Sequence, residues 1–264
     1  MLRSKPSAAE ITNRVRMLIA GFGDYVTTFD RDPAFTDDQL RHHLETCRLR
    51  DAEHRTAAAA AGDDQFLKSL WETLRSWRMQ ARGARLVDWP RFRLAFTACL
   101  EDIGALDGLS LDNRALPVRA VADKTWHLIE KLAISENSSK LVAGTKALHH
   151  LLPKLIVPMD RAFTGAFFGW NNYNWQHAQA ETLRSAFDVF AQIDRDVAAT
   201  KYVGPKWRSS GTKIIDNAIV AFCRANLLDE SSYIRPLEAR AKELGILDDI
   251  KAEARRIADQ QAQK

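Results

Sequence analysis

A helical fold is indicated most clearly by the segment KLVAGTKALHHLLPKLIVPMDR, which spans residues 140–161. Gly144 is placed where it can end one short helix, and Thr145 follows as an N-cap for a second. An extended, proline-containing run then leads to Asp160, which can cap the next helix. The segment therefore predicts two short helices joined by a glycine turn, a helix-hairpin-helix-like element near residues 136–152.

Amphipathic patterns continue on both sides of this segment, and their spacing is helical. No stretch has the sustained period-two alternation of a half-buried strand. We therefore expect an all-α fold, a compact multi-helix domain that spans residues 1–264. Within it, residues 1–62 should form peripheral N-terminal helices, residues 63–228 the core, and residues 229–264 a charged C-terminal helical tail.

Composition places the chain among ordinary globular proteins. With 264 residues, 46% of them hydrophobic, the chain can bury a core without a metal or disulfides. Its three cysteines, Cys47, Cys99 and Cys223, are far apart, which favours neither a disulfide framework nor a thiolate metal site. The basic N-terminus reaches only a short apolar patch, so we expect a cytoplasmic protein with no membrane partner.

The run from Gly144 to Lys146 suits a phosphate. Backbone amides at a helix start are free to donate, the helix dipole favours an anion, and Lys146 adds a positive charge. The alternative is an ordinary glycine C-cap followed by a Thr145 N-cap and a surface lysine. The glycine spacing is not that of a nucleotide-binding Walker loop.

The net charge of +4 permits a polyanionic partner but does not require one. Two clusters of basic residues can contact DNA phosphates, the first as a stripe along one predicted helix and the second with a stacking aromatic. The alternative for each cluster is a solvated basic edge. The first cluster comprises Arg75, Arg78, Arg82 and Arg85, and the second comprises Lys206, Trp207, Arg208 and Lys213.

The order of short helix, glycine turn, lysine-bearing helix, extended proline segment and Asp resembles the helix-hairpin-helix DNA glycosylase superfamily. In that superfamily the hairpin amides hold a DNA phosphate, the lysine forms an imine in bifunctional members, and the Asp polarises or deprotonates the attacking group. The resemblance implies these roles for Gly144, Lys146 and Asp160. Because the interval from Lys146 to Asp160 is shorter than in the superfamily, Lys140 is the alternative nucleophile.

A second resemblance is to uncharacterised bacterial proteins that share the runs GTKALHHLLP, residues 144–153, and PMDRAFT, residues 158–164. It also includes residues 70–86 and 213–217. This resemblance implies no activity, but it indicates that the whole chain is one family unit.

The histidines do not predict a metal site. His149 and His150 are adjacent, so on a helix their side chains point about 100° apart and cannot chelate one ion unaided. His42 and His43 have the same spacing on a polar helix, where we expect them to be solvated. We expect neither a metal nor a cofactor.

Together these patterns predict a DNA-interacting helical protein on a glycosylase-like scaffold, with duplex DNA as its partner. Base excision would use Asp160 with Lys146 or Lys140. The alternative is a non-catalytic helical binding or regulatory module, in which Asp160 and Lys146 serve as caps and a structural ion pair. The sequence leaves open whether the protein is an enzyme.

Overall fold

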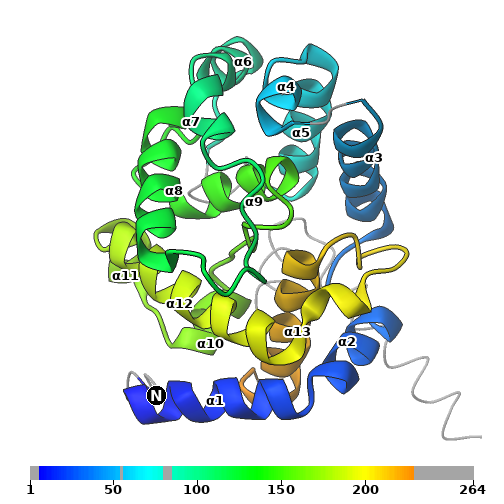
Figure 1. Cartoon of the computed structure of the whole chain (residues 1–264), viewed down its shortest axis with the longest axis vertical. Helices are drawn as coiled ribbons and strands as arrows, with labels where there is room; N and C mark the ends of the chain where they lie inside the picture. The colour runs from blue at the N-terminus through cyan, green and yellow to red at the C-terminus, as the bar shows by residue number, and fades with distance from the viewer. Residues whose placement is uncertain (1–5, 54–55, 80–84, 229–264) are drawn as a thin grey trace, which may run out of the picture. The chain divides into compact units, whose positions relative to one another are not determined.

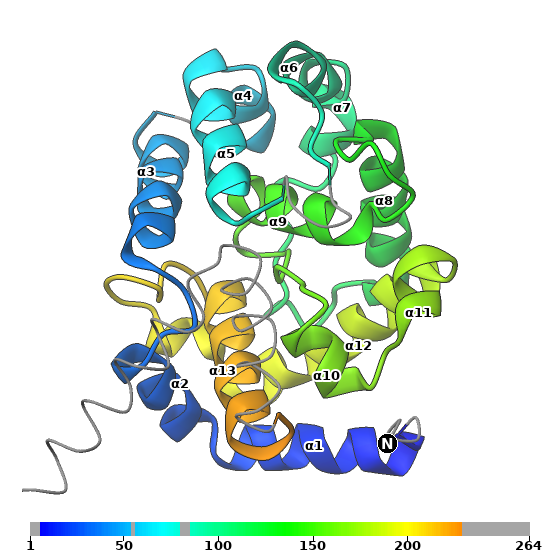
Figure 2. The same cartoon turned by 180° about the vertical axis from the view of Figure 1, so that it is seen from behind.

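A computed structural model of the chain describes residues 6–53, 56–79 and 85–228. These residues form α-helices and one short 3-10 helix, and no strand occurs among them (Figures 1 and 2). Their one extended pairing is an isolated bridge between Leu86 and Ser135. The expected all-α fold is therefore confirmed.

The chain divides into two compact units, residues 1–222 and 223–264, and the structure describes residues 223–228 of the second. The predicted C-terminal tail, residues 229–264, lies outside the described residues. In chain order the helices are α1 (Ala8–Ala20), α2 (Phe22–Arg31), α3 (Asp37–Glu53), α4 (Ala57–Ala61), α5 (Asp64–Ser76), α6 (Trp89–Thr97), α7 (Leu100–Gly104), α8 (Val118–Leu132), α9 (Leu141–Leu151), α10 (Phe163–Phe168), α11 (Asn172–Gln176), α12 (Gln179–Val197), the 3-10 helix η1 (Ala199–Tyr202) and α13 (Gly211–Asn226).

Several helices begin at the residues that the sequence marks. Ser7 and Glu10 form a reciprocal capping box at α1, in which each side chain accepts the other residue's backbone N–H. The Asp88 side chain caps α6 by accepting the Arg91 N–H, and a proline occupies the first turn. These helix starts are decided by local chemistry, which is why the sequence predicts them correctly.

Helix α9 lies at the centre of the packing that positions the site. It packs against α3, α4, α5 and α8, while α3 also runs beside α5 and α8 beside α12 (Figures 1 and 2). Every residue of α9 except Lys146 is buried. The lysine is therefore the single point at which this central helix reaches solvent.

Gly144 lies inside α9 and not at a turn, so the prediction of two short helices joined at Gly144 is wrong. Its N–H donates to the Lys140 carbonyl at 2.9 Å, as in any helix interior. The glycine instead allows α8 and α9 to approach closely, because a Cβ added there would lie 2.6 Å from Ile129 Cγ2. The predicted helix-hairpin-helix element near residues 136–152 is not confirmed: its first part, residues 135–140, is non-helical.

We expect Gly144→Ala to lower the free energy of unfolding. The clash with Ile129 involves branched atoms close to its backbone, so the net loss should be on the order of 1 kcal/mol, although alanine is the better helix former. Urea unfolding measures this change. The control is Gly104→Ala, whose Cβ would lie 3.7 Å from Ala58 Cβ, an ordinary contact that should cause no loss. Equal stability of the Gly144→Ala protein and the native protein would contradict the close-packing role.

Two further predictions about the N-terminal half need correction. Helix α5 ends at Ser76, so the basic stripe does not continue along one helix, and Arg82 lies outside the described residues. Helix α3 does not stand apart from the core, because it packs along α5 and contacts α9. Segments expected to be peripheral therefore contribute to the centre of the fold.

The three cysteines are free thiols, as the sequence predicts. Within the described ranges, no helix combines the length and the apolar character that crossing a membrane requires.

Candidate functional site

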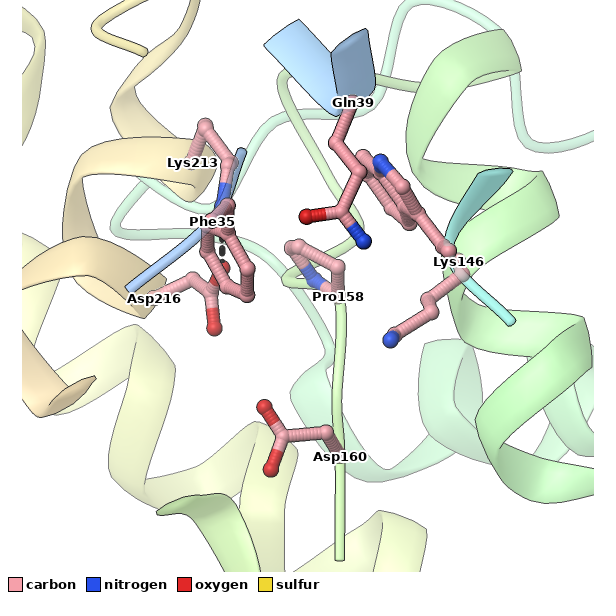
Figure 3. Close-up of a pocket in the computed structure, with 8 residues that line it drawn as sticks. Phe35, Gln39, Lys146, Pro158, Asp160, Lys213 and Asp216 are labelled. Carbon is pink, nitrogen blue, oxygen red and sulfur yellow. Dashed lines mark hydrogen bonds and ion pairs between the residues drawn. The ribbon is translucent and has the colours of Figure 1, made fainter. Parts of the chain in front are cut away.

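A small pocket lies where α3, α5, α9 and α13 meet the extended segment that precedes α10 (Figure 3). Its volume is about 60 Å³, which holds a few water molecules or a small polar group. Aromatic side chains and two pairs of oppositely charged residues share its wall. The lining residues are Phe35, Gln39, Trp77, Lys146, Pro158, Asp160, Lys213 and Asp216.

Lys146 and Asp160 extend into this pocket from different segments. Figure 3 shows the ammonium of Lys146 and the carboxylate of Asp160 separated by an open space below Pro158. No ion pair between the two occurs in the part of the chain that the structure describes. The Lys146 Nζ instead lies 5.3 Å from the ring centroid of Trp77, a cation–π distance. The space between amine and carboxylate can therefore receive a reacting group.

Lys146 and Asp160 are both half-buried, and the partial loss of water around them changes their proton affinities. Desolvation lowers the pKa of the Lys146 ammonium, because removal from water disfavours its charged form more than the nearby Asp160 carboxylate favours it. Desolvation likewise raises the pKa of Asp160, against the opposing effect of Lys146. Both shifts bring the groups nearer to neutral pH, which gives a lysine nucleophilic character and lets a carboxyl exchange protons.

One carboxylate oxygen of Asp160 is fixed by the start of α10. Oδ1 accepts the Phe163 N–H at 2.6 Å, and the Asp160 N–H donates to Thr164 Oγ1 at 3.1 Å. Asp160 thus binds an N–H in the first turn of α10, but the N-cap position of that helix is Ala162, so the prediction that Asp160 is the N-cap is confirmed only in part. The second oxygen, Oδ2, has no hydrogen bond to a described residue. One oxygen orients the side chain, and the other is available to a ligand.

Lys213 and Asp216 form a buried ion pair at the opposite side of the pocket. Their side chains are 1% and 6% exposed, and Lys213 Nζ lies 2.5 Å from Asp216 Oδ2. The ammonium also lies 4.7 Å from the ring centroid of Phe35 and 5.2 Å from that of Trp207. The prediction that Lys213 is a surface contact for DNA is therefore wrong, because its charge is enclosed by a carboxylate and aromatic rings.

Lys140, the alternative nucleophile, does not line the pocket. It precedes the first turn of α9, where its N–H donates to Gln179 Oε1 at 2.8 Å. Between the two lysines, the structure places Lys146 opposite Asp160.

The proposed anion site at the start of the second short helix does not form. The Gly144 N–H is used inside α9. The Thr145 hydroxyl donates to the Leu141 carbonyl at 2.9 Å and accepts the Met159 N–H at 3.3 Å. Both residues are buried, so neither presents a free donor to a phosphate.

The members of the second basic cluster differ in their exposure and pairing. Trp207 is buried, and its carbonyl accepts a hydrogen bond from Asn217. Arg208 pairs with Asp30 at 3.1 Å. Lys206 remains exposed. Only part of this predicted cluster is therefore available to a polyanion.

The described members of the first basic cluster are exposed. The Arg75 guanidinium lies 4.5 Å from the Trp71 ring centroid and pairs with Glu72 at 3.5 Å. Arg78 and Arg85 are exposed outside any helix. Arg78, directly after the pocket residue Trp77, has a left-handed backbone with φ of 59°.

His43 is buried and not solvated, so that prediction is wrong. Its ring stacks with Trp77 and with Trp207, at centroid distances of 5.8 and 5.4 Å. The pocket residues Phe35, Gln39 and Asp216 were also not predicted. The spacing of Lys213 and Asp216 at i and i+3 on an otherwise apolar helix is the one local signal that could have revealed a buried pair.

Comparison of the chain with protein-family models, with curated proteins and with solved structures gives no match. The two resemblances inferred from the sequence therefore stay predictions. What the pocket does must be judged from its own geometry and chemistry.

Proposed function

We propose that this pocket is the active site of a DNA-interacting enzyme of glycosylase type, in which Lys146 is the nucleophile and Asp160 the proton carrier. The observation that carries the proposal is the position of Lys146. It is the one residue of α9 that is not buried, and it faces Asp160 across an open space with no ion pair between them. If Asp160 and Lys146 formed a structural ion pair, their charged groups would be in contact and not separated by an open space.

The pocket admits only a small group, so we propose that the reacting carbonyl of a sugar, and not a complete base, enters it. A volume of about 60 Å³ suits a small polar group, so the substrate we propose is the open-chain aldehyde of an abasic site. Trp77 adds an indole N–H that has no hydrogen-bond partner among the described residues. A buried donor without a partner is costly, and an oxygen of the sugar or phosphate would satisfy it.

The proposed reaction gives the two facing groups complementary roles. The neutral Lys146 amine attacks the C1′ aldehyde, a carbon–nitrogen bond forms, and the aldehyde oxygen leaves as water with both protons of the amine. Asp160 transfers a proton from the nitrogen to the departing oxygen, because its raised pKa allows it to exchange protons. On a nucleotide with an intact base, the same attack would break the glycosidic bond, and its electron pair would leave with the base.

The second candidate function is a non-catalytic helical binding module. It is favoured by the hydrogen bond from the Phe163 N–H to Asp160 Oδ1, which is a helix-capping contact. That contact uses one oxygen and does not account for Lys146 or for the aromatic wall. The module would predict no covalent chemistry at Lys146.

Arg78 provides a test of the DNA partner. As a left-handed non-glycine residue just beyond α5, it carries backbone strain that Arg78→Gly would relieve, raising the free energy of unfolding by about 1 kcal/mol. Loss of its charge beside the pocket should weaken duplex DNA binding and reduce the slope of log K against log salt by about 1. Urea unfolding and a salt titration of DNA binding measure both effects.

Ala133→Gly is the matched control, because Ala133 is the left-handed C-cap of α8, with φ of 43°. It should gain similar stability, since it relieves the same strain, and leave DNA binding unchanged. Two results together would contradict a DNA partner at this surface. The Arg78→Gly protein would bind DNA as strongly as the native protein, and the affinity of the native protein for DNA would be the same at high and low salt.

A further inference from the structure

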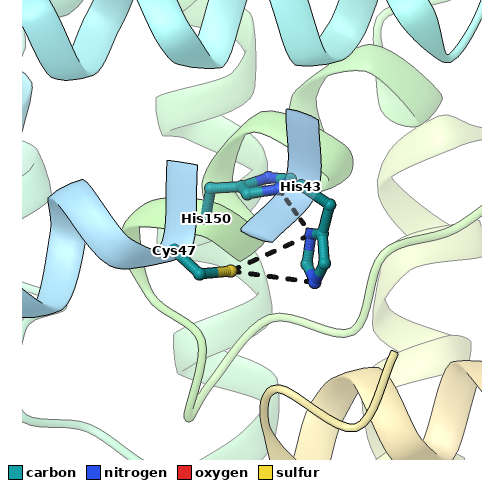
Figure 4. Close-up of side chains that lie close together, drawn as sticks. All are labelled: His43, Cys47 and His150. Carbon is teal, nitrogen blue, oxygen red and sulfur yellow. Dashed lines mark hydrogen bonds between the residues drawn. The ribbon is translucent and has the colours of Figure 1, made fainter. Parts of the chain in front are cut away.

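Three potential metal ligands meet between α3 and α9, beside the pocket (Figure 4). His43 and Cys47 are at positions i and i+4 of α3, so their side chains lie on the same helix face. His150 comes from α9. His43 Nδ1 lies 2.9 Å from His150 Nε2. The Cys47 sulfur lies 3.9 Å from His43 Nδ1 and 3.7 Å from His43 Nε2.

The outer nitrogen of each histidine is held by an oxygen. His150 Nδ1 lies 2.9 Å from the Lys146 carbonyl, and since a carbonyl can only accept, Nδ1 carries the proton. The His150 Nε2 lone pair therefore faces inward. His43 Nε2 lies 2.9 Å from Ser209 Oγ, a hydroxyl that can donate or accept. Oxygen partners on the outer nitrogens are the arrangement that orients histidines in metal sites.

We propose that His43 Nδ1, His150 Nε2 and Cys47 Sγ bind one Zn²⁺ ion. On binding, the His43 proton moves from Nδ1 to Nε2, from which it donates to Ser209 Oγ, and His150 keeps its proton on Nδ1. The Cys47 thiol releases its proton to solvent, since a thiolate is the ligand. Both histidines stay neutral, and one proton is released for each ion bound.

The geometry suits zinc. Zinc–nitrogen bonds of about 2.0–2.1 Å and zinc–sulfur bonds of about 2.3 Å in a tetrahedron separate neighbouring ligand atoms by roughly 3.3–3.6 Å. The observed separations of 2.9 Å between nitrogens and 3.9 Å between sulfur and His43 Nδ1 differ from these by a few tenths of an ångström. All the candidate ligand atoms lie within 4.8 Å of one another, so binding requires the side chains to close around the ion.

No fourth His, Cys, Asp or Glu joins the group among the described residues. Three protein ligands leave one coordination position for water or another small ligand. The ion would link α3 to the last turns of α9, where His150 is hydrogen-bonded to the Lys146 carbonyl. This proposal does not depend on the proposed DNA reaction, because it rests on different side chains.

The same atoms can also form a metal-free cluster, with a hydrogen bond from His43 Nδ1 to His150 Nε2. Burial then keeps Cys47 protonated, with its pKa raised to about 12. If this cluster is too stable to give up the Cys47 proton and the hydrogen bond between the histidines, Co²⁺ will not bind. A direct metal titration therefore separates the two states.

The test is a titration of the metal-stripped full-length protein with Co²⁺, followed by displacement with Zn²⁺. We expect one ion per chain, with a thiolate-to-cobalt charge-transfer band in the near ultraviolet and the visible bands of tetrahedral cobalt. Cys47→Ser should remove the charge-transfer band, and His150→Gln should weaken binding by at least about 10- to 100-fold.

Matched controls are available for both ligand types. Cys99→Ser removes a different buried thiol, and His42→Gln removes the histidine next to His43, and both should bind Co²⁺ as the native protein does. A native protein without a charge-transfer band overturns the proposal, whatever the stability of the variants. So does a band that persists in Cys47→Ser or disappears in Cys99→Ser.

Discussion

The Asp216→Asn protein is expected to lose about 3–5 kcal/mol of its free energy of unfolding, because the change leaves the Lys213 ammonium buried without a counter-charge. Lys213 is 1% exposed, so little solvent reaches it to replace the carboxylate. Phe35 and Trp207 would still face the ammonium, but cation–π contacts supply only part of what the carboxylate provides. Urea unfolding of the native and variant proteins measures the loss.

An exposed ion pair gives the control for this prediction. Lys131 Nζ lies 2.6 Å from Asp102 Oδ2, a similar separation, but the two side chains are 46% and 35% exposed. Water replaces such a partner readily, so Asp102→Asn should change stability far less. If Asp216→Asn and Asp102→Asn lowered the free energy of unfolding equally, burial of the Lys213–Asp216 pair would not determine how much it stabilises the fold.

Helix positions could be predicted from the sequence where local chemistry decides them. Capping by Ser7 and Asp88 and the start of α8 after Pro117 each depend on groups within one turn of the chain. Asp160 belongs to the same class, since a carboxylate three residues before a free backbone N–H is a local arrangement. These features needed no knowledge of the tertiary fold.

Gly144 shows why other features could not be predicted. A glycine followed by threonine fits both a turn and a helix interior, and the choice depends on how closely another helix approaches. Here Ile129 of α8 occupies the space that a Cβ would need, so the glycine is a packing residue inside α9. The sequence separation between these two helices hides that contact.

The pocket was only partly predictable for the same reason. Lys146 and Asp160 are close in sequence and were both predicted, whereas Phe35, Gln39 and Asp216 come from distant segments of the chain. The burial of His43 likewise depends on rings contributed by the residue after α5 and by the loop before α13. Side chains that become neighbours only through tertiary packing leave no local signal.

The second large effect concerns the chemistry of Lys146. We expect Lys146→Ala to abolish imine formation with abasic-site DNA, because no other described lysine faces Asp160 without a salt-bridge partner. Asp160→Asn should slow the same reaction by about 10²–10⁴-fold, since the amide cannot transfer a proton. Unfolding curves for both variants establish that the fold is retained.

Lys140→Ala is the matched control for the nucleophile. It removes a lysine six positions earlier in the sequence that does not line the pocket, so the reaction should proceed as in the native protein. This comparison distinguishes chemistry at Lys146 from a general contribution of positive charge to DNA binding.

The most direct measurement is borohydride trapping of the protein on duplex DNA that contains one abasic site. Hydride reduction converts an imine at Lys146 into a stable amine, which joins protein and DNA covalently. The expected result is a covalent adduct with the native protein and with Lys140→Ala, and none with Lys146→Ala. Two results would contradict the proposed role of the pocket. Either the native protein forms no adduct, or the Lys146→Ala protein forms the adduct as readily as the native protein does.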